Sequence, residues 1–231
     1  MIFRQLFDHE SSTYTYLLGD SKTGEALLID PVIANTDSYL SLLKQLNLTL
    51  KVCVDTHTHA DHITALGALR ERTGCITMMG EQAMADCVSQ SFAHLDQIEA
   101  GSIKLQVLYT PGHTDDSYSF YVPDAAMLFT GDTLLIRGTG RTDFQNGDAL
   151  AQYHSIQDLL LTLPEDTEIY PAHDYKGWSK SSIREERQYN PRLQVSNAEE
   201  YAAIMAALKL PNPKLMDIAV PANQACGEPG F

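Results

Sequence analysis

Residues 56–62 constrain this chain more than any other stretch, because they read Thr-His-Thr-His-Ala-Asp-His. Neutral imidazole and carboxylate groups together suit zinc, iron or manganese. A polar helix start, with Asp61 as the cap and the histidines facing water, is the ordinary interpretation of a single histidine here. Histidines and an aspartate packed this closely favour a metal site instead.

The histidine motif lies between a predicted strand and a predicted helix. Residues 50–54 are rich in β-branched side chains, as expected of a buried strand. After the motif, Ile63, Leu66 and Leu69 recur at helical spacing, and Gly74 follows as a stop signal. The motif therefore occupies a strand-to-helix loop at the carboxyl end of a strand, where open α/β sheets place their ligands.

Net charge limits the classes of partner. The 231 residues include 16 basic and 30 acidic side chains, giving a formal net charge of −14. This balance argues against nucleic acid and anionic membrane surfaces, which select clustered Lys and Arg. A small anionic substrate remains compatible if a few basic residues and a metal cation make its pocket positive. Because no repeat or composition break marks a linker, we expect a single domain over residues 1–231, with a helical and extended C-terminal segment from about residue 179.

The cysteines and the N-terminus predict the compartment. Cys53, Cys75, Cys87 and Cys226 form no C-x-x-C or paired spacing, so we expect reduced thiols in a reducing compartment. The first residues contain neither an apolar signal region nor an Arg/Ser-rich presequence, and no apolar run approaches membrane-spanning length. We therefore expect a cytoplasmic protein.

The remaining pattern predicts alternating strands and helices. We expect strands at residues 2–7, 14–18, 26–29, 75–79, 103–109, 117–122, 126–129 and 168–170. We expect helices at residues 36–46, 181–188 and 198–208, and a further one that Asp148 caps and that continues to about residue 161. Residues 81–97 have no decisive pattern, and residues 216–231, with their prolines and glycines, are expected to be extended.

Metal-binding residues recur where predicted strands end. His57, His113, Asp132 and His173 each follow a short strand, in loops that contain Gly, Pro or Thr. Alone, each could be a turn or cap residue. If the carboxyl ends of these strands lie together, however, the loops converge on one point, which favours a shared site.

These motifs, in this order, resemble the metallo-β-lactamase superfamily. Thr-His-Thr-His-Ala-Asp-His is followed by Thr-Pro-Gly-His-Thr, Thr-Gly-Asp and Pro-Ala-His-Asp within residues 1–175. The resemblance implies an α+β fold, the αββα four-layer sandwich, with a metal site along one edge. Residues 131–145, together with residues 12–18 and 219–223, are similar to the persulfide dioxygenase family, and extend the resemblance to nearly the whole chain.

The narrower resemblance implies one Fe(II) per chain, held by His57, His113 and Asp132. It also implies a glutathione-dependent sulfur dioxygenase that oxidises glutathione persulfide with O2 to sulfite and glutathione, a reaction of sulfide detoxification. Two imidazoles and a carboxylate on one face of iron leave positions for the persulfide sulfur and for O2.

Further ligand-type residues complicate the count of metals. The chain also contains His59, Asp61, His62 and His173, which complete the ligand set of a two-metal relative. Ligand counting therefore leaves a mononuclear and a dinuclear site open. From the resemblance, we expect these four residues to orient the ligands and to supply hydrogen bonds near bound oxygen species.

Substrate binding requires cations, because glutathione carries two carboxylates. Arg141, close after the predicted ligand Asp132, is the first candidate, followed by Tyr175 and Lys176. Weaker candidates complete the set: Arg137, Arg192 and Asn223.

Two other functions compete with the dioxygenase. A glyoxalase II-like hydrolase would use two metals to attack a glutathione thioester. Against it stand the Gly-Arg-Thr-Asp-Phe segment, residues 140–144, and the short region of 58 residues after His173. A non-catalytic binding protein would not need the intact ligand set. The sequence does not determine the oligomeric state, and a homodimer is kept as an expectation.

Overall fold

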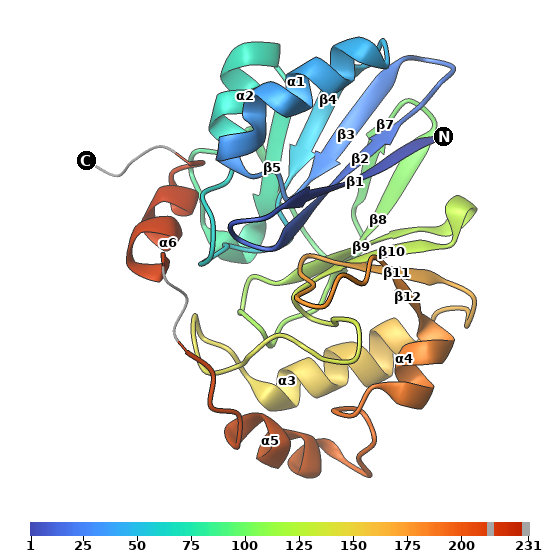
Figure 1. Cartoon of the computed structure of the whole chain (residues 1–231), viewed down its shortest axis with the longest axis vertical. Coiled ribbons are helices and arrows are strands. Elements are labelled where there is room, and N and C mark those ends of the chain that lie inside the picture. Colours follow the sequence, from blue (N-terminus) through green and yellow to red (C-terminus); the bar gives the residue numbers. More distant parts are fainter. Residues whose placement is uncertain (212–214, 228–231) are drawn as a thin grey trace. The chain divides into compact units, whose positions relative to one another are not determined.

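The computed structural model describes residues 1–211 and 215–227 (Figure 1). The chain divides into two compact units. Unit 1 comprises Met1–Ala93, Gln97–Leu105 and Asn212–Phe231, and unit 2 comprises His94–Asp96 and Gln106–Pro211. The single domain expected over residues 1–231 stays a prediction.

Unit 1 contains a mixed sheet in the order β1-β2-β3-β4-β5-β6. Its strands β1 to β3 pair antiparallel, whereas β3 to β6 pair parallel. The strands of this unit are β1 (Ile2–Asp8), β2 (Thr13–Gly19), β3 (Glu25–Ile29), β4 (Thr49–Val54), β5 (Ile76–Gly80), β6 (Gln90–Phe92) and β7 (Gln97–Ala100). Its helices are α1 (Thr36–Gln45), α2 (Leu66–Thr73) and α6 (Met216–Gln224), with the short 3-10 turns η1 (Ile33–Asn35) and η2 (Glu81–Ala83).

The second sheet has the order β12-β11-β10-β9-β8-β7. In it β10 and β11 pair parallel, and β8 to β10 pair antiparallel. Its further strands are β8 (Ile103–Tyr109), β9 (Tyr118–Val122), β10 (Met127–Gly131), β11 (Glu168–Pro171) and β12 (Ser181–Ser182). The helical elements of unit 2 are η3 (Pro123–Ala125), α3 (Ala149–His154), η4 (Ser155–Leu159), η5 (Leu160–Thr162), α4 (Ile183–Tyr189) and α5 (Ala198–Ala206).

Each unit buries its own apolar cluster. In unit 1, α1 places Tyr39 and Leu43 in the core, with Asp37 in its first turn and Lys44 in its last, charges that favour the helix dipole. In unit 2, the cluster gathers side chains from several strands and helices: Leu128, Ile156, Ile169, Ile183 and Tyr201. Burying such side chains removes apolar surface from water and supplies most of the stabilisation.

Strand register brings the predicted site residues to sheet edges. In unit 1, Ile29 of β3 pairs with Val54 of parallel β4, so the residues after both strands share one edge. In unit 2, Gly131 of β10 pairs with Pro171 of parallel β11, which places the following Asp132 and His173 at a common edge. Strand β8, which precedes His113, runs in the same direction as β10, because both pair antiparallel with β9.

Most predicted elements are confirmed, and residues 103–109 form β8 with the expected bounds. Asp148 caps α3, accepting from the N–H groups of Leu150 and Ala151, but the helix continues as a π turn and a 3-10 turn. The undecided region after β5 forms η2 and β6. The expected extended tail is wrong, because α6 forms despite Pro221; the part of this expectation at residues 228–231 lies outside the described residues.

The expectation of four reduced cysteines is also wrong. Cys87 and Cys226 form a disulfide across 139 residues of sequence, whereas Cys53 and Cys75 are free and buried. Burial raises the pKa of both free thiols, which keeps them protonated and unreactive. Within the described ranges, no helix has the length and apolar character needed to cross a membrane.

Candidate metal centre

In unit 1, a buried hydrogen-bonded chain orients His57. The Thr56 hydroxyl donates to Oδ2 of Asp30 at 3.0 Å, and its oxygen, Oγ1 of Thr56, lies 3.0 Å from Nδ1 of His57. Because a hydroxyl has one proton to donate, Thr56 accepts from Nδ1 of His57. The imidazole therefore carries its proton on Nδ1, which leaves the lone pair on Nε2, as a metal ligand requires.

The other polar residues of the histidine loop, residues 55–65, pack beside His57. The ring of His59 lies 4.1 Å from that of His57 and 4.3 Å from that of His62. Nε2 of His59 lies 3.2 Å from Oδ1 of Asp30, and Nδ1 of His62 lies 2.9 Å from Oδ2 of Asp61. The three histidines and Asp61 of the motif therefore lie together in unit 1. Carboxylates orient the rings of His59 and His62.

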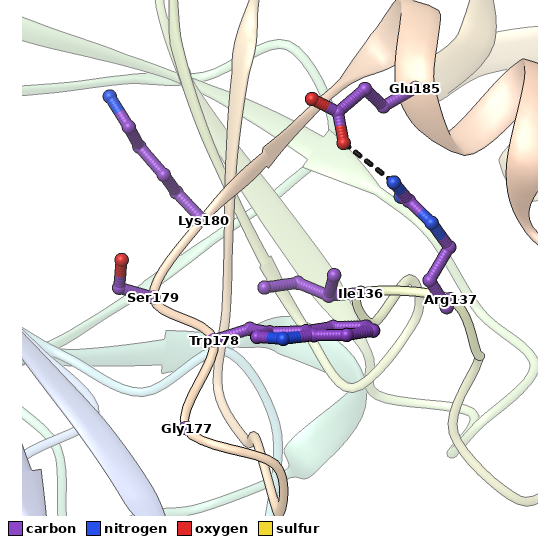
Figure 2. Close-up of a pocket in the computed structure, with 7 residues that line it drawn as sticks. All are labelled: Ile136, Arg137, Gly177, Trp178, Ser179, Lys180 and Glu185. Carbon is purple, nitrogen blue, oxygen red and sulfur yellow. Dashed lines mark hydrogen bonds and ion pairs between the residues drawn. The ribbon is translucent and has the colours of Figure 1, made fainter.

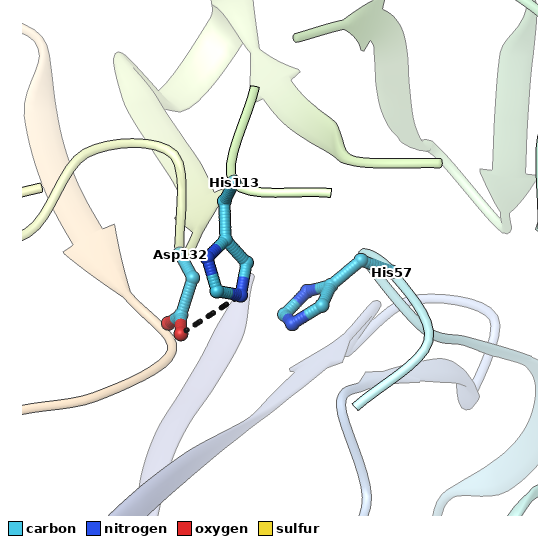
Figure 3. A group of neighbouring side chains, drawn as sticks. All are labelled: His57, His113 and Asp132. Carbon is cyan, nitrogen blue, oxygen red and sulfur yellow. Dashed lines mark ion pairs between the residues drawn. The ribbon is translucent and has the colours of Figure 1, made fainter. Parts of the chain in front are cut away.

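In unit 2, Asp132 faces two histidines. Nε2 of His113 lies 3.6 Å from Oδ2 of Asp132, and Nε2 of His173 lies 3.7 Å from Oδ1. Figure 3 draws the three predicted iron ligands, with the approach of His113 to Asp132 as a dashed line. Both separations exceed a hydrogen bond, so the carboxylate is near both rings without being bonded to either.

The backbone after Asp132 sets the orientation of His113. Nδ1 of His113 donates to the carbonyl oxygen of Arg141 at 2.7 Å. A carbonyl can only accept, so the proton is on Nδ1 and the lone pair is on Nε2, toward Asp132. Gly140 makes this approach feasible: its N–H donates to the Asp132 carbonyl at 2.7 Å, and a Cβ on it would lie 2.8 Å from Nδ1 of His113.

These groups fit a metal ion. Oδ1 of Asp132 is buried and has no hydrogen-bond partner among the described residues, a costly condition for a carboxylate unless it serves as a ligand. His57 and His113 both present a lone pair on Nε2 while Nδ1 is hydrogen-bonded. Two imidazoles and a carboxylate form the donor set of open non-haem iron sites.

The candidate arginines have internal partners. Arg141 forms a bidentate ion pair with Asp143 and donates to the Pro211 carbonyl at 2.7 Å. The hydrogen bond from Arg141 lowers the pKa of Asp143, so the pair is charged at neutral pH. Arg137 pairs with Glu185 and Glu186.

Arg192 is committed in the same way. It donates to the carbonyl and hydroxyl oxygens of Thr139. Burial lowers the pKa of this guanidinium, though it stays charged because of its high starting value. Arg192 therefore holds internal backbone in place of facing a ligand.

Tyr175 and Lys176 differ, because both are exposed and follow His173. The Tyr175 ring stacks on the His173 ring at 6.0 Å, and Nζ of Lys176 lies 4.9 Å from the centre of the Trp178 ring. Trp178 also lines a shallow hollow in unit 2 (Figure 2). Of its charged lining residues, Arg137 and Glu185 pair with each other, and Lys180 pairs with Glu168. The backbone N–H of Lys176 donates to Oδ2 of Asp174 at 2.7 Å, but its ammonium group is not part of those ion pairs and has no carboxylate partner among the described residues.

Asn223 has a different place from the one expected. As a weak candidate for substrate binding it should face a pocket, but its side chain is fully buried. Its amide bonds three backbone groups of the histidine loop, from Thr64, His59 and His62. These bonds occupy the carboxamide of Asn223, and its expected contact with substrate stays a prediction.

Asp30, Thr56 and Gly140 also shape the site, although they were not predicted from the sequence. Asp30 follows a predicted strand, as the predicted metal ligands do, and this position was a usable signal. Thr56 lies inside the motif, but the sequence does not indicate that its hydroxyl bonds to Asp30 and His57. The role of Gly140 depends on packing against His113, which no local pattern reveals.

Comparison with known proteins identifies the family. The model of the metallo-beta-lactamase superfamily matches residues 10–85 and 92–173. The human protein named persulfide dioxygenase ETHE1, mitochondrial, is 47% identical over 231 residues, covering 98% of this chain and 89% of the relative. A hydroxyacylglutathione hydrolase from Thermosynechococcus vestitus is 34% identical over 197 residues, covering 84% and 75%.

A solved structure agrees along the whole chain. The crystal structure of ETHE1 from Myxococcus xanthus superposes with a TM-score of 0.96 at 54% identity, covering 99% of this chain and 100% of that one. The match confirms the predicted α+β class and the metallo-β-lactamase fold, with two mixed sheets and helices. The chain belongs to the metallo-β-lactamase superfamily and, within it, to the persulfide dioxygenases.

Proposed function

We propose that this enzyme oxidises glutathione persulfide with O2 and water, giving sulfite and glutathione, at a mononuclear Fe(II) site. Family membership supports the reaction class, since the human relative described above is named persulfide dioxygenase. The proposal also specifies that the metal is iron and that the persulfide is carried by glutathione.

The proposed iron ligands are His57, His113 and Asp132, a group of side chains that each offer one ligand atom. The observation that carries this assignment is the hydrogen bond from Nδ1 of His113 to the Arg141 carbonyl, which leaves Nε2 as the donor atom. Ferrous iron, when bound, supplies the open positions and the electron density that O2 chemistry needs.

The protein residues position the reactants and fix the protons. Asp30 and Thr56 hold the proton of His57 on Nδ1, and Arg141 does the same for His113 through its carbonyl. His59 and His62, each oriented by a carboxylate, and His173 would supply polar ring atoms for hydrogen bonds to the reactants. Asp61 contributes by holding the ring of His62.

We propose that Lys176 is the first residue to bind a carboxylate of glutathione, with Tyr175 contacting the substrate beside it. Lys176 carries a cation that no carboxylate of the described residues neutralises, next to the loop of His173. The pairing of Arg141 with Asp143 makes Arg141 a weaker candidate for binding a substrate carboxylate. An ion-paired guanidinium nevertheless keeps donors for a second carboxylate.

A second candidate is a dinuclear hydrolase of glutathione thioesters. His59, Asp61 and His173 form another group of side chains able to hold a metal ion. The similarity to a hydroxyacylglutathione hydrolase also favours it, though at a lower identity and coverage than that to the human dioxygenase.

Location and assembly follow from the sequence as further proposals. The net charge of −14 supports an enzyme of small molecules without nucleic acid or membrane partners. A cytoplasmic location was inferred partly from reduced thiols, and the Cys87–Cys226 disulfide removes that part of its support. The human relative is named as mitochondrial. A homodimer stays a proposal to be tested by mass measurement in solution.

The first experiment is metal analysis combined with O2 consumption on addition of glutathione persulfide. About one iron per chain, with O2 uptake and sulfite formation, supports the dioxygenase. Asp132→Ala should abolish both iron content and O2 uptake, and retained activity would remove Asp132 from the site. Two metals per chain with thioester hydrolysis and no O2 uptake would favour the hydrolase.

A further inference from the structure

The histidine loop of residues 55–65 is held from α6, a helix far along the chain. The Asn223 side chain, on α6, is fully buried. Its Oδ1 accepts from the Thr64 N–H at 2.8 Å, and its Nδ2 donates to the carbonyls of His59 and His62, each at 2.8 Å. All these groups belong to unit 1.

This contact requires the chemistry of asparagine. The site offers one backbone donor and two backbone acceptors, and a carboxamide has two N–H donors and an acceptor oxygen in one plane. An ionised aspartate could accept from Thr64 but would face the carbonyls of His59 and His62 with negative charge. An alanine would leave three buried backbone groups without partners, each costly.

The turn that directly follows α6, residues 225–227, is itself attached by contacts that do not involve the side chain of Asn223. The Cys226 carbonyl accepts from the N–H of Gly67 at 2.9 Å, and Cys226 forms the disulfide with Cys87. Gly227, at φ 86°, packs so close to the Thr64 carbonyl that an added Cβ would collide with it. The helix is therefore a fixed support from which Asn223 can set the path of the loop.

We propose that Asn223 is a positioning residue for the metal centre. By fixing the carbonyls of His59 and His62, it determines the course of the loop that carries His57, and so the direction of the His57 ring. This role rests on the proposed function only for the identity of the metal. Asn223 touches neither substrate nor reacting atoms and acts through the histidine loop.

The first test is ferrous iron affinity, measured anaerobically by competition with a chelator. Asn223→Ala and Asn223→Asp should both weaken iron binding by about 10- to 100-fold, as loss of an orienting partner does in other metal sites. Leu43→Ala, in the core around α1, is the control, because it costs about 2–5 kcal/mol of stability without changing groups that hold the loop. Its iron affinity should equal that of the wild type.

The second test is amide hydrogen exchange in the metal-free protein. Asn223→Ala should speed exchange across residues 55–65 by about tenfold, whereas Leu43→Ala should not act selectively there. In Asn223→Asp, the Thr64 amide should stay protected, because Oδ1 still accepts from it.

The two readouts separate this inference from the proposed function. Wild-type iron affinity in both Asn223 variants, or unchanged exchange in the loop, overturns the positioning role while the dioxygenase stands. If the wild-type chain binds no iron, the proposed function fails, and the exchange experiment still decides the role: faster exchange supports it and unchanged exchange overturns it.

Discussion

The carbonyl oxygen of Arg141 accepts a hydrogen bond from Nδ1 of His113 at 2.7 Å. The sequence drew attention to the guanidinium of Arg141, yet its backbone orients the predicted ligand. Loops that supply a carbonyl to a metal-binding histidine control both its proton and its ring direction. The backbone from Asp132 to Arg141 is therefore as important to the proposed site as the side chains it connects.

Substituting Gly140 tests that backbone. Gly140→Ala should reduce iron affinity by about 10- to 100-fold, because the new Cβ would meet the His113 ring and the Asp132 carbonyl. Gly138→Ala is the matched control, since its Cβ would lie 4.0 Å from the nearest atom outside its chain neighbours. Equal iron affinity in the two variants would show that the close approach of Gly140 has no functional weight.

A valine at position 56 removes the hydroxyl of Thr56 while keeping a side chain of nearly the same size. Thr56→Val removes the hydrogen bonds that connect Asp30 to His57, so the His57 proton loses its fixed position. Iron affinity should therefore fall by about tenfold. Thr56→Ser retains the hydroxyl and should bind iron as the wild type does. The measurement is anaerobic iron titration; a loss in both variants would point to packing of the methyl group instead.

Steady-state kinetics test the proposed contact of Lys176 with substrate. Lys176→Ala should raise KM for glutathione persulfide about tenfold, the loss of a charge-assisted contact of about 1.5 kcal/mol, with kcat little changed. Lys180→Ala removes a nearby lysine that is paired with Glu168 and should leave KM unaltered. A fall in kcat with constant KM would contradict a binding role for Lys176.

The disulfide should contribute measurably to stability. Cys87→Ser should lower the free energy of unfolding by about 2–4 kcal/mol, because a cross-link spanning 139 residues restricts the unfolded chain. Urea denaturation measures this. A reducing agent should shift the wild type to the midpoint of the variant and leave the variant unchanged; an identical midpoint for oxidised wild type and variant would refute the contribution.

Asp20 should make unit 1 sensitive to acid. Hydrogen bonds from the N–H groups of Lys22 and Ser102 hold the pKa of this carboxyl well below its usual value of 3.8. A depressed native pKa contributes stability above the unfolded pKa, and that stability is lost as pH falls through the native value. Urea midpoints between pH 5 and pH 2 should therefore fall more steeply in the wild type than in Asp20→Asn. Parallel curves would show that Asp20 does not contribute.

Local sequence signals predicted the parts of the fold that depend on neighbouring residues. Strand β8, the cap Asp148 and the ligand-type residues after strands were accessible, because periodicity and turn chemistry act within a few positions. The pairing of Cys87 with Cys226 was not, since each cysteine lacks a local partner.

Helix α6 was missed for a related reason. Pro221 lowers the helical propensity of the segment, whereas the burial of Ala219, Ala222 and Asn223 that stabilises it comes from tertiary contacts. The same holds for the bonds of Asn223 to His59 and His62, whose sequence separations of 164 and 161 residues lie beyond any local pattern.

That separation of 164 residues between His59 and Asn223 has a consequence during synthesis. At a translation rate of 5–20 residues per second, about 10 to 30 s pass between the emergence of the two residues from the peptidyl transferase centre. Throughout this interval the nascent chain carries its histidines without the contact that arranges them. The order of translation therefore delays maturation of the centre until the helix bearing Asn223 has been made and has docked.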